Sequence, residues 1–412
     1  MAVYVWYPIL ASLAVGFAFM NLPPLADDLM ALYGVSYGGL SLLFSALLWA
    51  HSLFQIPSGL IIDKFGPYKT LVFSGLLAIF ANLAPFLAYS SLALAISMRL
   101  VLGLCTCLNF LSVLKLIGQM APKDQIAKLQ GYQGGAFCLG TVLPYLCLSI
   151  GGGLSWKWAY LICAIMFVLV LAATPAIREK KPKSSGDSGV SNVSYVSGAS
   201  DESSVSWAGL VRTAIPAILK SKEIWALGLL HGFSFGTLNN LGQWLPSILS
   251  ERSGRPLAHW TTFTIIILLI GTLSRCGSGL ILTLISKSAA IIGVVLSVAG
   301  LYLWLGLSGN IWLTLVLGIM LAALSGLNYG PIFNLGGLVM KPAYMGTALG
   351  FLVMVANLTN VALTMILGNG KDYTGSFQAG LILAGIMSII SLVIFGRTIR
   401  NLDSTIKMRH HT

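Results

Sequence analysis

Long apolar runs recur along almost the whole chain and limit it to one class of fold. A helix needs about 20 mostly apolar residues to cross the hydrocarbon core of a bilayer. Twelve segments of this kind are present, at residues 3–24, 36–62, 71–90, 92–118, 127–150, 156–176, 224–248, 258–283, 288–306, 311–337, 344–368 and 376–396. Only 9% of the residues are charged, whereas soluble proteins carry about 25%. Because a span in lipid must satisfy its own backbone hydrogen bonds, we predict an all-α membrane protein with twelve transmembrane helices.

The Lys and Arg residues are distributed unevenly over the connecting loops. If the N-terminus is cytoplasmic, the loops outside the membrane hold only Lys157, Arg252, Arg255 and Lys371. The bases within spans are Arg99, Lys115 and Arg275, and all the others fall in cytoplasmic loops and in the C-terminal tail. By the positive-inside rule, we predict a multi-pass protein of the cytoplasmic (inner) membrane with both termini in the cytoplasm. This topology accounts for the net charge of +12 without a nucleic-acid partner.

The longest polar segment, residues 177–223, separates six spans from six. Its middle is rich in serine, which is typical of a low-complexity linker; regulation by phosphorylation is the alternative. The stretch that follows, WAGLVRTAIPAILKSK, mixes apolar residues with bases and is typical of a short helix on the membrane surface. We expect residues 1–176 to form an N-terminal six-helix half and residues 224–396 a C-terminal six-helix half. Residues 397–412 would form a cytoplasmic tail.

Short matches between the two halves indicate an internal duplication. GFAF at 16–19 matches GFSF at 232–235, SGLIID at 58–63 matches SGLILT at 278–283, and LVLG occurs at 100–103 and at 315–318. The matches keep their order in the chain and nearly the same offset. The expected fold is therefore two pseudo-symmetric six-helix halves. Parallel repeats of this kind suit alternating access, in which the halves rock about a site near the membrane midplane.

The loop after the second span, SGLIIDKFGPYK, resembles the signature of the major facilitator superfamily, G-x-x-x-D-(R/K)-x-G-x-(R/K)-(R/K). The matching residues are Gly59, Asp63, Lys64, Gly66 and Lys69. Tyr68 stands where the family has a further base. In the fourth span, Arg99-Leu-Val-Leu-Gly103 resembles the family's Arg-x-x-x-Gly. The resemblance extends over nearly the whole chain and implies the major facilitator fold.

The resemblance also implies that this loop is a conformational latch. Asp63 would lie where one helix ends, close to the N-terminus of a helix of the other half. A carboxylate at a helix N-terminus is stabilised by about 0.3–1 kcal/mol. Lys64 and Lys69 would hold the carboxylate by charge pairing, and Gly59 and Gly66 would allow close helix approach and a tight turn. The alternative is a plain cytoplasmic loop that obeys the positive-inside rule.

Ionisable residues inside spans are costly and usually functional, and here the deep ones are basic. Arg275 corresponds to Gln55 in the repeat, so both are candidates to face a central cavity and bind substrate. Pairing of Arg275 with backbone carbonyls, or snorkelling, is the alternative. Arg99 matches a family motif tied to coupling, and Lys115 is expected to snorkel. None of the twelve acidic residues lies deep in a span. This absence favours an anionic substrate, either a small carboxylate or an inorganic oxyanion.

Further polar residues within spans are candidates for the substrate site. His51 shares a helix face with Gln55, and His51 and His231 could carry coupling protons, because histidine titrates near neutral pH. The tenth span contains GLNYGP, in which Pro331 is expected to break the helix. The other candidates, which would line the cavity or make interhelical hydrogen bonds, are Asn239, Asn240, Gln243, Asn328, Tyr329, Asn357 and Asn360.

The expected function is secondary active transport of a small anionic solute by alternating access. Two alternatives stay open: a proton-coupled exporter of a neutral or amphipathic compound, and a transporter-like receptor or scaffold that moves no solute. The sequence has no Walker loop, nucleophile elbow or metal-ligand cluster, and its six cysteines lack metal-ligand spacing. We therefore expect no enzyme activity, catalytic residue, metal or cofactor. The expected partners are the bilayer, the solute and coupling protons, and the expected state is a monomer.

Overall fold

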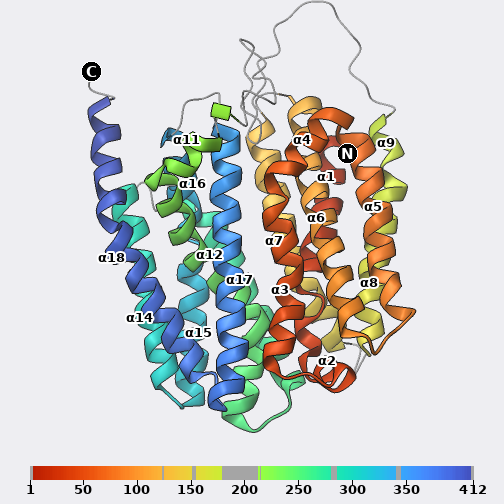
Figure 1. Ribbon diagram of the computed structural model, residues 1–412, viewed down its shortest axis with the longest axis vertical. Helices are drawn as coiled ribbons and strands as arrows, with labels where there is room; N and C mark the ends of the chain where they lie inside the picture. The colour runs from red at the N-terminus through yellow and green to blue at the C-terminus, as the bar shows by residue number, and fades with distance from the viewer. Residues whose placement is uncertain are drawn as a thin grey trace, which may run out of the picture.

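The computed structural model describes residues 3–122, 125–150, 155–178, 212–213, 215–279, 285–339 and 345–409. Within these ranges every regular element is a helix, and most helices run roughly along one common direction (Figure 1). The Ser-rich part of the predicted linker lies outside the described residues. Of the predicted surface helix, the described part contains the short helix α11 (Ile215–Lys220).

The helices form two groups that lie side by side (Figure 1). The N-terminal bundle comprises α1 (Val3–Met20), α2 (Ala26–Tyr33), α3 (Tyr37–Leu53), α4 (Gln55–Phe65), α5 (Pro67–Leu83), α6 (Leu92–Met120), α7 (Ile126–Ile150), α8 (Trp156–Ala173) and α9 (Pro175–Arg178). The C-terminal bundle comprises α11, α12 (Lys222–Ser253), α13 (Thr261–Cys276), α14 (Lys287–Leu307), α15 (Ile311–Ser325), α16 (Tyr329–Val339), α17 (Met345–Thr374) and α18 (Gln378–Arg409).

Every predicted span coincides with a helix or with a pair of consecutive helices. Among the described residues, nine helices are long and apolar enough to cross a membrane, and the bent pair α3–α4 makes a tenth. The two other predicted spans, 127–150 and 224–248, coincide with the long helices α7 and α12. The prediction of an all-α membrane protein is therefore confirmed. The last helix runs on to Arg409, past the predicted end of its span at residue 396, so much of the predicted tail is helical.

Two spans are broken next to a proline. α3 and α4 meet at an angle of 54°, and Pro57 has no N–H to donate to the carbonyl of Leu53 four residues earlier. α15 and α16 are separated by residues 326–328, just before Pro331. The predicted break at Pro331 is confirmed, whereas the bend at Pro57 was not expected.

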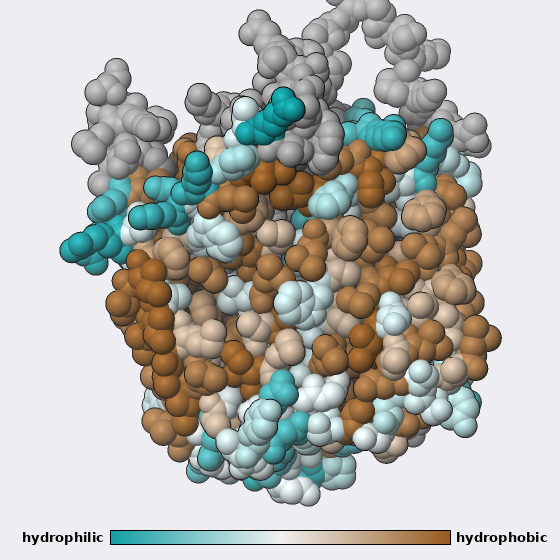
Figure 2. Space-filling model, viewed as in Figure 1, coloured by the Kyte–Doolittle hydropathy of each residue, from teal (hydrophilic) through white to brown (hydrophobic). Residues whose placement is uncertain are grey.

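Both ends of the chain lie at the same end of the molecule. α1 begins and α18 ends there, at the top of Figure 1, and we call this the terminal end and the opposite one the distal end. Between the two ends, apolar side chains dominate the flank of the molecule (Figure 2). Phe73 on α5, Leu273 on α13 and Val393 on α18 are 59%, 71% and 79% exposed. An apolar surface of this extent is unfavourable in water and suits contact with lipid.

Candidate functional site

A cavity of about 240 Å³ lies between the two bundles. Its walls come from α1, α3, α4, α6 and α7 on one side and from α12, α13, α16 and α17 on the other. Several lining residues lie toward the terminal end, such as Leu114 late in α6, Gln130 early in α7 and Leu349 early in α17. Most of the lining is apolar or aromatic. Its polar residues are His51, Gln55, Gln130, Gln133, His231, Arg275, Tyr329 and Asn357.

Arg275 reaches the cavity from the last turn of α13. Its guanidinium carbon lies 4.1 Å from the ring centre of Tyr329 and 5.3 Å from that of Phe235. The break between α15 and α16 explains this position. A Cβ atom at Gly326 would collide with the backbone nitrogen of Arg275, so glycine allows the break to pack directly against α13. Tyr329, the first residue of α16, is thereby placed against the guanidinium.

The positive charge of Arg275 has no acidic neighbour among the described residues that line the cavity. Two aromatic rings stabilise the guanidinium by about 0.5–2 kcal/mol through cation–π contacts. A guanidinium directs its N–H donors outward in its own plane. This planar fork matches a carboxylate or an oxyanion, which it binds through two parallel hydrogen bonds. Because the surrounding lining is mostly apolar, the field of the charge is weakly screened.

Two histidines, one from each bundle, also line the cavity. Nδ1 of His51 lies 3.1 Å from Oγ1 of Thr106, and this hydroxyl donates to the carbonyl oxygen of Gly103 at 2.8 Å. Because a hydroxyl has a single hydrogen, Nδ1 of His51 is the donor in the first contact, and Nε2 of the neutral ring is an acceptor. His231 stacks on Phe235 with ring centroids 5.7 Å apart. The cavity therefore has one imidazole ring on the side of each bundle.

The cavity brings together five of the residues predicted to bind substrate, namely His51, Gln55, Arg275, Tyr329 and Asn357. Gln55 and Arg275 occupy matching positions of the sequence repeat. They now face the same cavity from opposite bundles. The alignment of the two repeats therefore pairs two residues that line the same cavity.

The other predicted substrate-binding residues lie outside the cavity lining. Nδ2 of Asn240 donates to Oδ1 of Asn360 at 2.9 Å, which joins α12 to α17. Gln243 makes a second link between these helices by accepting from a threonine hydroxyl at 3.0 Å. Asn328 contacts a backbone carbonyl of α14, and Asn239 is buried within the C-terminal bundle. In this structure the side chains of Asn240, Gln243, Asn328 and Asn360 hold helices of one bundle together.

Most of the residues that line the cavity were not anticipated from the sequence, among them Phe235, Gln130 and Gln133. Phe235 is the last residue of the repeated GFSF motif and lies four positions after His231, on the same helix face. Gln130 and Gln133 are polar residues in a span, which is itself a signal of a functional or paired position. Nε2 of Gln133 donates to the carbonyl oxygen of Phe110 at 3.1 Å and so joins α7 to α6 beside the cavity.

Arg99, predicted to act in coupling, is buried inside the N-terminal bundle and does not line the cavity. Its Nη1 atom donates to the carbonyl oxygen of Ala18 and to Oδ1 of Asn21, both at 2.9 Å. These bonds tie α6 to the end of α1. An arginine placed in this way positions helices and does not touch a solute in the cavity.

Asp63 of the signature loop is held by its own bundle. Its Oδ1 atom lies 2.5 Å from Nζ of Lys115 on α6, and the two side chains are 45% and 29% exposed. Lys64 and Lys69, the predicted charge partners, are exposed. Residues 340–344, which precede α17 of the other bundle, lie outside the described part. The described contact of Asp63 is therefore with Lys115, which was expected to snorkel.

Comparisons with known proteins agree with the fold. The model of the Major Facilitator Superfamily matches residues 9–364. The chain is 24% identical over 369 residues to the probable sulfoacetate transporter SauU of Cupriavidus necator, covering 85% of this chain and 83% of that protein. It is 23% identical over 367 residues to the nitrite extrusion protein of Bacillus subtilis, covering 87% and 85%. A shorter match, 29% identical over 135 residues, covers 32% of this chain and 22% of the Xenopus laevis solute carrier family 2, facilitated glucose transporter member 12.

Two solved structures share the fold at low sequence identity. A bacterial homologue of the human lysosomal transporter Spinster, in an inward-facing and unoccupied conformation, has a TM-score of 0.73 at 13% identity, covering 98% of this chain and 96% of that one. The D-xylose–proton symporter has a TM-score of 0.69 at 16% identity, with coverage of 94% and 96%. Because the family model spans most of the chain and these folds agree with it, the protein belongs to the major facilitator superfamily.

Proposed function

We propose that this protein is a secondary transporter that moves a small anion across the cytoplasmic membrane. Membership of the family makes it a transporter and not an enzyme. The observation that carries the anion assignment is Arg275, a cation in a cavity whose described lining holds no acidic residue. The names of two relatives, a sulfoacetate transporter and a nitrite extrusion protein, support the same class of solute.

The proposed solute carries one negative charge. Arg275 is the only Lys or Arg among the described residues that line the cavity. While His51 and His231 are neutral, binding of a dianion there would leave one charge without a partner in a mostly apolar space, which is costly. A monocarboxylate or a monovalent oxyanion is matched in charge by one guanidinium. The aromatic and aliphatic lining would contact the rest of an organic solute.

We further propose that transport uses alternating access between the two bundles, with the terminal end in the cytoplasm. The cavity lies toward the terminal end, and hydrogen bonds join the bundles toward the distal end, where the Tyr145 hydroxyl donates to the carbonyl oxygen of Gly242. This arrangement corresponds to a cytoplasm-facing state. The inward-facing, unoccupied conformation of the Spinster homologue supports this assignment.

Protons are the proposed coupling ions. His51 and His231 line the same cavity as Arg275. Protonation of either histidine would add a second positive charge beside the anion site and strengthen anion binding. Anion and proton would then move in the same direction. A proton-coupled exporter of a neutral compound stays the alternative, and the solute screen below separates the two.

The test is a thermal-shift screen of the purified protein against anions and neutral solutes. The panel contains short monocarboxylates, dicarboxylates, nitrite, nitrate, phosphate and sugars. We expect stabilisation by one or more monoanions, loss of that shift in Arg275→Gln, and no loss in Arg400→Gln. Arg400 is the matched control because it is an exposed arginine on α18, outside the cavity lining. Stabilisation by neutral solutes alone, or an unchanged shift in Arg275→Gln, would contradict the anion assignment.

A further inference from the structure

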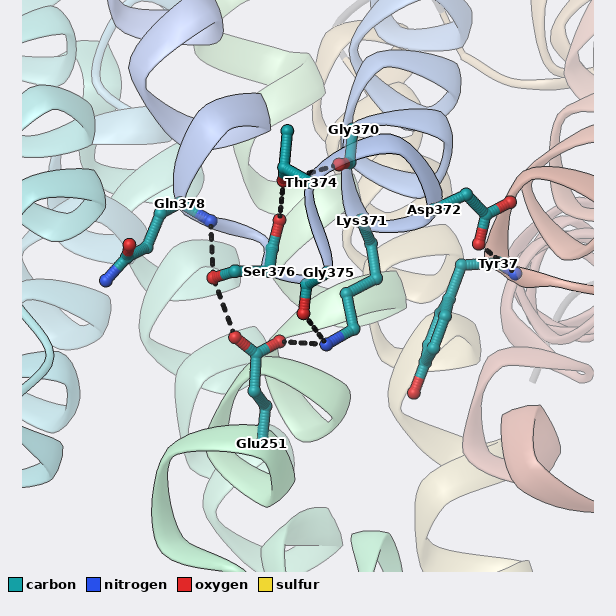
Figure 3. Close-up of polar contacts among 9 residues, drawn as sticks. All are labelled: Tyr37, Glu251, Gly370, Lys371, Asp372, Thr374, Gly375, Ser376 and Gln378. Atoms are coloured by element: carbon teal, nitrogen blue, oxygen red, sulfur yellow. Dashed lines mark hydrogen bonds and ion pairs between the residues drawn. The ribbon is translucent and has the colours of Figure 1, made fainter.

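The carboxylate of Asp372 joins the two bundles at the distal end (Figure 3). Oδ1 of Asp372 on α17 accepts from the backbone N–H of Tyr37 at 3.0 Å, and Oδ2 accepts from that of Gly38 at 2.6 Å. Tyr37 and Gly38 are the first two residues of α3, and Ser36 before them makes no side-chain cap. The first N–H groups of a helix lack intrahelical partners and carry partial positive charge. Asp372 therefore caps a helix of the opposite bundle.

The same contact includes two glycines, Gly38 of α3 and Gly368 of α17, each packed closely against the opposite helix. A Cβ atom at Gly38 would lie 2.7 Å from side-chain oxygens of both Asn369 and Asp372. A Cβ atom at Gly368 would lie 2.5 Å from Cβ of Ser41. Side chains at either position would hold α3 and α17 apart. The carboxylate reaches the backbone of α3 because these helices touch so closely.

Lys371, the neighbour of Asp372, makes its ion pair within its own bundle. Its Nζ atom lies 2.9 Å from Oε2 of Glu251 on α12 and donates to the carbonyl oxygen of Gly375 at 2.7 Å. Oε1 of Glu251 accepts from the Ser376 hydroxyl at 2.8 Å. Figure 3 shows this network beside the side chain of Tyr37, whose ring centre lies 5.7 Å from Nζ of Lys371. These contacts of Glu251 and Lys371 hold the residues after α17 against the C-terminal bundle. The carboxylate of Asp372 takes no part in them and contacts α3 instead.

We propose that Asp372 is a positioning residue of the transport cycle, a latch that holds the distal end shut. While Asp372 caps α3, the ends of α3 and α17 cannot separate and the cavity is reached from the terminal end. Opening of the distal end requires the carboxylate to leave the α3 N–H groups, which water then solvates. The inference rests on the proposed alternating-access cycle and not on the chemical nature of the solute.

A carboxylate that can hold the two bundles together then lies at each end of the α3–α4 span and its neighbour α17. Asp63 lies at the terminal end of the α3–α4 span, and Asp372 lies at the distal end of α17. In this structure Asp63 is bound to Lys115 of its own bundle, whereas Asp372 is bound to the opposite bundle. Among the described residues, the contact of Asp63 stays within one bundle at the end where the cavity lies, and the contact of Asp372 closes the far end. A cycle that exchanges these two contacts would avoid a state open on both sides.

Pulsed EPR distances between spin labels at the distal end test the latch in the full-length protein in lipid nanodiscs. Ala31→Cys in the N-terminal bundle and Gly309→Cys in the C-terminal bundle give exposed label sites. Four native cysteines are buried, so only Cys147 and Cys276 need replacement by serine. We expect a mainly short distance in the parent protein. Asp372→Asn should raise the ratio of long to short distances by about tenfold, because the negative charge and one of the two acceptor oxygens are lost.

The matched control is Asp28→Asn, which removes an exposed carboxylate on α2 near the same end. An unchanged ratio in Asp372→Asn, or an equal change in Asp28→Asn, would overturn the proposal. If Asp372→Asn does not fold, Gly38→Ala gives the same test, since its Cβ separates the helices while the carboxylate stays. Anion-dependent thermal stabilisation, measured on the same samples, distinguishes failure of the latch proposal from failure of the anion proposal. Asp372→Asn should still be stabilised by the anion. If the parent protein is not stabilised, that result counts against the anion site and not against the latch.

Discussion

Replacing Gly140 by alanine should force α7 away from α1, the helices that bring Phe137 and Phe19 to the cavity. A Cβ atom at Gly140 would collide with the carbonyl oxygen of Leu13 and would lie 3.0 Å from Cα of Gly16. Ordinary contacts between carbon atoms lie at about 3.5–4.0 Å, so the backbones must separate by roughly 0.5–1 Å. Overpacking of this size costs about 1–3 kcal/mol.

The matched control is Gly131→Ala on the same helix. No heavy atom lies within 4 Å of a Cβ atom at Gly131. In a helix interior alanine is favoured over glycine by about 1 kcal/mol, so this substitution should be neutral or stabilising. The same chemical change should therefore give effects of opposite sign at two positions of α7.

Thermal unfolding in detergent, followed by tryptophan fluorescence, measures the difference. We expect a melting temperature several degrees below the parent for Gly140→Ala and one at or above the parent for Gly131→Ala. Equal melting temperatures would refute the reasoning that direct backbone contact holds α1 against α7. A melting temperature of Gly131→Ala below that of the parent would refute the conclusion that a Cβ atom at this position meets no neighbour.

Four further experiments test contacts within the bundles and at the terminal end. Arg99→Met should lower the melting temperature, because each buried acceptor left unpaired costs about 1–3 kcal/mol; an unchanged value would mean that these bonds add no net stability. Asn240→Ala and Asn360→Ala should be coupled by about 0.5–3 kcal/mol in a double-mutant cycle, and additive effects would contradict a direct bond. Lys115→Met should change stability by less than about 1 kcal/mol, because the pair is partly exposed. Asp63→Asn should slow transport while solute-dependent stabilisation persists, and loss of that stabilisation would argue against a latch.

The membrane spans follow from sequence because their cause is local. About 20 apolar residues cross the bilayer wherever they occur, and lipid requires them to be helical. The break before Pro331 has an equally local cause, the missing N–H. The bend at Pro57 has the same cause and could have been predicted, but the apolar run continues through it.

Only part of the candidate site could be predicted from the sequence, because the rest depends on how distant helices pack. The repeat register predicted that Gln55 and Arg275 face one cavity, because a duplication preserves which helix faces point inward. It could not predict the contact between Arg275 and Tyr329, which depends on how the α15–α16 break packs against α13. The asparagines of α12 could not be assigned either. A polar face suits a cavity and a neighbouring helix equally, and the packing of α17 decides between them.

Anion exchange in proteoliposomes tests the role of Arg275 most directly. Vesicles loaded with an unlabelled anion from the stabilising set are diluted into the same anion carrying a label, and label uptake is followed over time. We predict rapid uptake by the parent protein and by Arg400→Gln, and uptake at least about thirtyfold slower in Arg275→Gln at low solute concentration, because a charged hydrogen-bonded contact is lost. Uptake at the parent rate in Arg275→Gln would contradict anion transport through this cavity.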